Sequence, residues 1–189
     1  ASTKVDVSSL RQPLGVVGVI TPFNFPAMVP MWFFPIAIAA GNCAVIKPSE
    51  HTPTVSALIA KLLPEYLDRD AVAVVEGAAA ETQELLDQAL DHVFFTGGPE
   101  IAKAILAGAA KHLTPVTLEL GGKSPVIVAG DAAVRVAARR IAWTKSLNSG
   151  QTCIAPDYVL VERSVRDEFV AELKTAIDTF VPQDEQMLP

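Results

Sequence analysis

The chain has few of the residues that build disulfide scaffolds, metal centres or nucleic-acid surfaces. It holds two cysteines and three histidines in 189 residues, and its formal net charge is −6. Two cysteines are too few for a disulfide framework and fit a reducing compartment. We therefore expect a cytoplasmic protein. The acidic balance argues against nucleic acid and anionic membranes as partners. The histidines show no ligand spacing, and no metal site is predicted.

Charge is missing altogether from residues 12–46, a stretch long enough to span a bilayer. Five prolines interrupt this stretch, and each removes a backbone donor and clashes with the preceding turn. Lipid would leave those backbone groups without partners. We therefore interpret the stretch as a buried strand, a turn, a buried helix and a second strand, with a membrane span as the alternative. The first residues have no apolar signal core.

Strand-like and helix-like patterns alternate along the chain, which is typical of an α/β protein. Half of the residues are hydrophobic, and their continuous apolar runs suit strands that are covered on both faces. These runs predict a doubly wound, mostly parallel sheet, which is a Rossmann-like fold. The predicted strands of this sheet are residues 15–21, 43–47, 71–76, 92–96 and 116–120.

We place a domain boundary at Gly121-Gly122, so that a cofactor domain covers residues 1–120 and the start of a second α/β domain covers 121–189. Further strands are predicted at 125–128 and 158–162. A helix carrying Leu85 to Leu90 is predicted before the boundary. After it, Ser164 with Asp167 resembles a capping box that begins the last helix.

Cys153 follows a turn of small residues, Asn148-Ser149-Gly150. A thiolate can be exposed in such a place, and backbone N–H groups there can point at an oxyanion. The pattern predicts a nucleophile, but a small buried hydrophobic side chain remains the alternative. Cys43 lies inside an apolar strand, and we interpret it as part of the core.

Two further polar residues are candidates for chemistry. Glu119 ends an apolar strand before two glycines, where desolvation would make its carboxylate a stronger base. The alternative is a solvated carboxylate or one paired with Lys123. Asn24 lies between phenylalanines and prolines, where a rigid amide could donate to a developing alkoxide or simply close a turn.

The second strand ends in Lys47-Pro48-Ser49-Glu50, at the edge where open α/β sheets bind ligands. An acidic residue there suits the ribose hydroxyls of a dinucleotide, and the lysine can reach the same sugar. An ordinary solvated loop is the alternative. Thr96-Gly97-Gly98 precedes a helix and could hold pyrophosphate, although it is not the full Gly-x-Gly-x-x-Gly pattern.

Five runs in this order resemble the NAD(P)-dependent aldehyde dehydrogenase superfamily, and the likeness covers nearly the whole chain. The runs are Pro22-Phe23-Asn24-Phe25-Pro26, Lys47-Pro48-Ser49-Glu50, Phe95-Thr96-Gly97-Gly98, Glu119-Leu120-Gly121-Gly122-Lys123 and Gly150-Gln151-Thr152-Cys153.

The resemblance implies roles for the catalytic candidates. Cys153 would form a thiohemiacetal with an aldehyde, and hydride transfer to the nicotinamide would leave a thioester. Asn24 and the Cys153 backbone N–H would form the oxyanion hole, and Glu119 would activate the water that releases the carboxylic acid.

The resemblance also implies the cofactor and the partners. The cofactor would be NAD, with NADP possible, the substrate a small aldehyde, and the full-length assembly a homodimer or homotetramer. Lys47 and Glu50 would contact the adenosine ribose, and Gly97-Gly98 would be the phosphate turn. The implied cofactor-binding residues are Thr21, Pro22, Lys47, Glu50, Gly77, Thr96, Gly97, Gly98, Leu120 and Gly121.

The subfamily features are mixed. From Thr52 onward the chain resembles class 3 aldehyde dehydrogenases, whereas residues 22–41 resemble methylmalonate-semialdehyde dehydrogenases. That CoA-acylating branch lacks the base glutamate that this chain has at Glu119, which favours hydrolytic oxidation. CoA acylation and a dinucleotide-binding module without turnover remain the alternatives. We expect a partial or recombined chain. Gly98, Pro99 and Ala102 depart from the residues that usually form the phosphate turn in this family.

Overall fold

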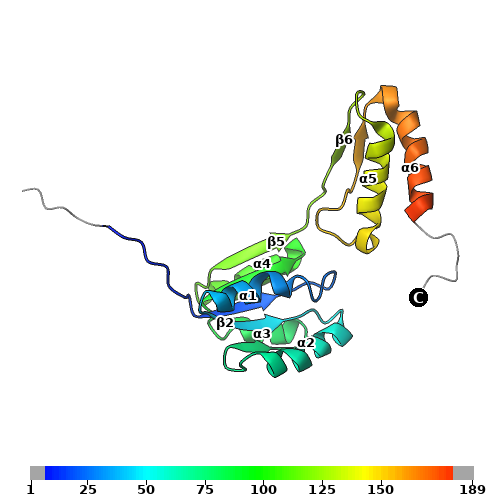
Figure 1. Ribbon diagram of the computed structural model, residues 1–189. Helices are drawn as coiled ribbons and strands as arrows, with labels where there is room; N and C mark the ends of the chain where they lie inside the picture. The colour runs from blue at the N-terminus through cyan, green and yellow to red at the C-terminus, as the bar shows by residue number, and fades with distance from the viewer. Residues whose placement is uncertain (1–6, 181–189) are drawn as a thin grey trace, which may run out of the picture. The chain divides into compact units, whose positions relative to one another are not determined.

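A computed structural model describes residues 7–180 of the chain (Figure 1). The chain divides into two compact units, Ala1–Leu120 and Gly121–Pro189. Within the described residues, no helix combines the length and the apolar character that crossing a membrane requires.

The first unit is built on a five-stranded sheet in which every neighbouring pair of strands is parallel. The strand order is β3-β2-β1-β4-β5, so the chain winds outward in one direction from β1 and then crosses to β4. The predicted doubly wound α/β sheet is therefore confirmed. The strands are β1 (Val16–Ile20), β2 (Cys43–Lys47), β3 (Val72–Val74), β4 (His92–Gly97) and β5 (Val116–Leu120).

Helices cover both faces of this sheet, because the buried strands alternate apolar side chains between two cores. On one face Val17, Val19 and Ile46 pack with residues of α1 (Pro30–Ala39), and Leu63 of α2 (Pro53–Tyr66) packs against the same core. On the other face Ile20, Val93 and Phe95 pack with residues of α3 (Ala79–Leu86) and α4 (Pro99–Ala110).

The second unit pairs two short parallel strands, β6 (Val126–Val128) and β7 (Val159–Val161). Its helices are α5 (Val134–Ser146) and α6 (Arg166–Phe180), with short 3-10 turns η1 (Leu147–Gly150) and η2 (Arg163–Val165). Val128, Val134, Ala138 and Phe169 form its core.

The structure corrects three local predictions. Helix α3 ends at Leu86, so Leu90 lies beyond it, and Ala89 has a positive φ of 56° that a helix cannot contain. The predicted strand 71–76 is shorter, because only Val72–Val74 pair with β2. Ser164 does not begin a capping box, since its hydroxyl donates to Glu162 at 2.9 Å and α6 starts only at Arg166.

Candidate functional site

A cleft of about 480 Å³ lies in the first unit, at the carboxyl ends of β1 and β4. These two strands are adjacent and parallel, but the connection from β1 leads to β2 on one side, whereas β4 begins the strands on the other side. This reversal of strand order makes the position the switch point where open α/β sheets bind ligands. Seven of the predicted cofactor residues line the cleft: Thr21, Pro22, Lys47, Glu50, Thr96, Gly97 and Gly98.

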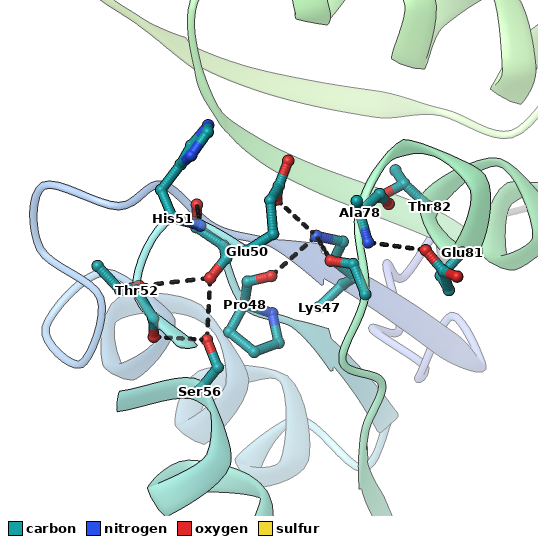
Figure 2. Close-up of polar contacts among 11 residues, drawn as sticks. Lys47, Pro48, Glu50, His51, Thr52, Ser56, Ala78, Glu81 and Thr82 are labelled. Atoms are coloured by element: carbon teal, nitrogen blue, oxygen red, sulfur yellow. Dashed lines mark hydrogen bonds and ion pairs between the residues drawn. The ribbon is translucent and has the colours of Figure 1, made fainter. Parts of the chain in front are cut away.

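Lys47 is the most constrained charged residue at the cleft. Its side chain is only 4% exposed, and its ammonium reaches the Pro48 carbonyl at 2.9 Å, the Gly77 carbonyl at 2.6 Å and Glu50 Oε2 at 3.2 Å (Figure 2). An ammonium has three N–H donors, so these acceptors satisfy all of them. A buried charge is tolerated only with such partners.

Glu50 faces this ammonium from a half-exposed position. A hydrogen bond from its own backbone N–H, together with the hydrogen bond and charge of Lys47 and the charge of His51, holds the pKa of Glu50 below its usual value. Partial burial opposes that shift. Glu50 is therefore an anion that can accept hydrogen bonds at neutral pH, as recognition of ribose hydroxyls requires.

Thr21 and Thr96 line the cleft from the ends of β1 and β4, and the hydroxyl of each is buried without a hydrogen-bond partner among the described residues. Buried polar atoms in native proteins are normally paired, so each such atom needs an explanation. Polar groups of a bound ligand would supply the missing partners. The cleft and its donors thus fit the ribose and phosphates of a dinucleotide.

Helix α4 begins at the cleft with Gly98 as its N-cap and Pro99 at its first position. A Cβ at Gly98 would meet no atom within 4 Å, so a ligand can approach this backbone closely. The free N–H groups and dipole of a helix N-terminus favour an anion such as pyrophosphate. Pro99, however, brings no N–H, so this terminus offers one donor fewer than most.

The remaining predicted cofactor residues lie outside the cleft lining. Gly77 acts through its carbonyl, which accepts from Lys47, and Leu120 ends β5. Gly121 begins the second unit. The roles of Leu120 and Gly121 toward a cofactor stay predictions.

Glu119 lies near the carboxyl end of β5, and the strand register pairs it with Thr96 of β4. Of the two environments that the sequence left open, desolvated or solvated, the structure shows the solvated one, because β5 is an edge strand and Glu119 is exposed. Lys123, its suggested partner, instead forms an ion pair with Asp157 at 3.2 Å. Asn24 lies in the bend after β1 and is partly buried.

Cys153 belongs to the second unit and is an exposed free thiol. It follows three consecutive residues with positive φ: Asn148 at 52°, Ser149 at 55° and Gly150 at 76°. Left-handed backbone at non-glycine residues is costly and gathers at functional sites. The Thr152 hydroxyl beside the thiol is buried without a partner among the described residues. Because Glu119 and Cys153 lie in different units, their meeting remains a prediction.

The sequence reasoning missed part of the cleft. Helix α3 contributes Thr82 and Gln83 to its lining, and His51 contacts the ring of Phe23 edge-on at its mouth, with 5.9 Å between ring centres. It also missed Glu81, whose carboxylate accepts from the Ala78 N–H at 2.7 Å. The sequence signal that could have identified Glu81 is an acidic residue three positions after Ala78, the N-cap of α3. Among the described residues, no group of three or more potential ligands could hold a metal ion.

Comparison with known proteins agrees with this geometry. The family model "Aldehyde dehydrogenase family" matches residues 1–187. Aldehyde dehydrogenase family 3 member A2 of Mus musculus is 48% identical over 94% of this chain and 37% of its own length. The "Aldehyde dehydrogenase, dimeric NADP-preferring" of Canis lupus familiaris is 49% identical over 92% of this chain and 38% of its own.

A solved structure of Staphylococcus aureus AldH in a substrate-bound state superposes with a TM-score of 0.86 at 46% identity, covering 93% of this chain and 38% of that one. The chain thus spans less than two-fifths of the length of the relatives it matches. With the family model matched over nearly its whole length, the chain belongs to the aldehyde dehydrogenase family.

Proposed function

We propose that the enzyme containing this chain oxidises an aldehyde to a carboxylic acid with NAD(P)⁺ and water. The observation that carries this proposal is the cleft at the β1–β4 switch point, where the Glu50 carboxylate can accept from ribose hydroxyls, Lys47 holds that carboxylate, and two threonine hydroxyls lack partners among the described residues. The first unit is then the cofactor domain, and the second is the beginning of the catalytic domain. When bound, NAD(P)⁺ supplies the acceptor for the hydride.

The chain's own residues would carry the covalent steps. The Cys153 thiolate adds to the aldehyde carbon, and the carbonyl electron pair moves onto oxygen, where the Asn24 amide and the Cys153 N–H stabilise the charge. Loss of hydride leaves an acyl thioester on Cys153. Glu119 then accepts a proton from water as the water attacks the acyl carbon, and the C–S bond breaks to release acid and thiolate.

The exposure of Cys153 and the strained turn before it support the nucleophile assignment. Glu50 supports NAD⁺ over NADP⁺, because its anionic carboxylate would repel a 2′-phosphate. The dog relative is described as dimeric and NADP-preferring. We propose a cytoplasmic homodimer for the enzyme that contains this chain.

Replacing the nucleophile tests this function. Cys153→Ala is expected to abolish NADH formation from hexanal or benzaldehyde and to leave the NAD⁺ dissociation constant unchanged, since every cleft residue lies in the first unit. Isothermal titration and absorbance at the NADH band measure the two quantities. Turnover that survives the substitution would remove Cys153 from the mechanism. Binding without turnover in the unsubstituted chain would favour the dinucleotide-binding module.

A further inference from the structure

The ammonium of Lys47 donates to a carbonyl of the turn at residues 77–78, and Glu81 accepts a hydrogen bond from the same turn. Gly77 supplies the shortest of the three acceptors of Lys47, at 2.6 Å. The next residue, Ala78, donates its N–H to Glu81 Oε2 at 2.7 Å (Figure 2). A contact thus runs from the first turn of α3 through residues 77–78 to the cation at the cleft.

Glu81 fits this turn closely. Gly77 has a φ of +138°, and a Cβ there would lie 2.4 Å from Glu81 Cγ. Ala78 is the N-cap of α3 and has no side-chain acceptor, so only the carboxylate half of a capping box exists. The Thr82 hydroxyl closes the same turn by donating to the Ala78 carbonyl at 2.7 Å.

The charge of Glu81 also acts on the cation. Hydrogen bonds from the N–H groups of Ala78 and of Glu81 itself, followed by the charge of Lys47, lower the pKa of the Glu81 carboxyl. Glu50 thus pairs with the ammonium directly, whereas the exposed Glu81 carboxylate adds a weaker, more distant negative charge, and all three donors of the ammonium are used. A dianionic group arriving at Lys47 would meet net negative charge and no free donor.

We propose that Glu81 is a positioning residue that makes the cleft select a 2′-hydroxyl over a 2′-phosphate. It fixes the Gly77 carbonyl on Lys47 and adds a second negative charge behind that ammonium. The inference rests on the proposed dinucleotide site and names a residue outside the cleft lining that adds to the effect of Glu50 on the choice between NAD⁺ and NADP⁺.

The test compares Glu81→Gln with Glu84→Gln in the 189-residue chain. Glu84 lies on the same helix, is exposed, and its carboxylate accepts no hydrogen bond from the 77–78 turn among the described residues, so it matches the change in net charge. In Glu81→Gln the new amide oxygen can still accept from Ala78, so this variant removes charge and keeps the turn. We expect it to lower the NADP⁺ dissociation constant about three- to tenfold and to change the NAD⁺ constant less than about twofold.

Two further readouts separate this role from a merely structural one. The effect of Glu81→Gln on NADP⁺ is expected to shrink as salt is raised, because it is electrostatic. Glu81→Ala is expected to speed hydrogen exchange at the Ala78 amide more than Glu81→Gln does. Titration calorimetry and exchange measured by NMR follow these quantities.

Equal NAD⁺-to-NADP⁺ ratios in the two glutamine variants would overturn the role of Glu81 and leave the dinucleotide site standing. No binding of either nucleotide to the unsubstituted chain would instead overturn the site and the inference together. Unchanged exchange at Ala78 in Glu81→Ala would overturn the positioning part.

Discussion

At the scale of single residues, the Lys47–Glu50 pair shows how a local motif becomes a site. Lys47 is buried because it ends a covered strand, and its charge is tolerated because two carbonyls and a carboxylate surround it. The sequence predicted that both residues lie at the edge of the sheet where ligands bind, but it did not predict their ion pair. It did not predict the Gly77 carbonyl, which comes from thirty residues away.

The depressed pKa of Glu50 predicts a dependence of stability on pH. Because this pKa is lower in the folded than in the unfolded chain, the stabilisation is fully present above the usual value of 4.5 and is lost as the pH falls through the folded value. The side chain is 43% exposed, so solvent screening limits the effect to less than about 1 kcal/mol. Thermal unfolding of the chain and of Glu50→Gln, from about pH 3 to 7, should show a gap that closes in acid. A gap that widens in acid would contradict the assignment.

A second prediction at the scale of single residues concerns the effect of Glu119 on turnover. In the enzyme containing this chain, Glu119→Gln should lower steady-state turnover by about 10²- to 10⁴-fold, because water attack on the thioester loses its base. Hydride transfer should change much less, so rapid-quench experiments should find acyl-enzyme accumulating after a burst of NADH. Turnover that is insensitive to this change but accelerated by CoA would support acyl transfer to CoA instead.

At the scale of elements, the start of α4 decides how well the cleft can hold an anion. Gly98 has an extended backbone, with φ −80° and ψ 152°, and open space around its Cα. Gly97, its neighbour, is closed in, since a Cβ there would lie 2.5 Å from the Phe95 ring. Of these two adjacent glycines, only Gly98 has room for a side chain.

This difference gives a matched pair of variants. Gly98→Ser should place a hydroxyl at an N-cap, add a few tenths of a kcal/mol to helix stability, and tighten NAD⁺ binding about two- to tenfold through one new donor. Gly97→Ser should destabilise the first unit by about 1–3 kcal/mol through overpacking against Phe95. Titration calorimetry and thermal unfolding measure both. Weaker NAD⁺ binding in Gly98→Ser would show that the pyrophosphate does not lie at this helix start.

At the scale of the whole molecule, the division into Ala1–Leu120 and Gly121–Pro189 places the cleft and Cys153 in different units, whereas Asn24 and Glu119 belong to the same unit as the cleft. The complete lining of the cleft comes from the first unit, and Cys153 comes from the second. A chain of residues 1–120 is therefore expected to fold and to bind NAD⁺ with the dissociation constant of the 189-residue chain. Circular dichroism and calorimetry on the fragment test this. Loss of binding in a folded fragment would mean that the second unit contributes to the site.

The sequence by itself determined the order of strands and helices along the chain and the positions of the turns between them, because apolar runs, glycines and prolines set the backbone conformation over a few residues. The places where strands end predicted Lys47, Glu50 and Thr96 of the cleft lining, and the family resemblance added Thr21. Only the tertiary structure decided that Glu119 is exposed on an edge strand and that Glu81 holds the Gly77 turn onto Lys47. Those contacts depend on which strand lies at the sheet edge and which loops meet across it, and packing between distant segments sets both.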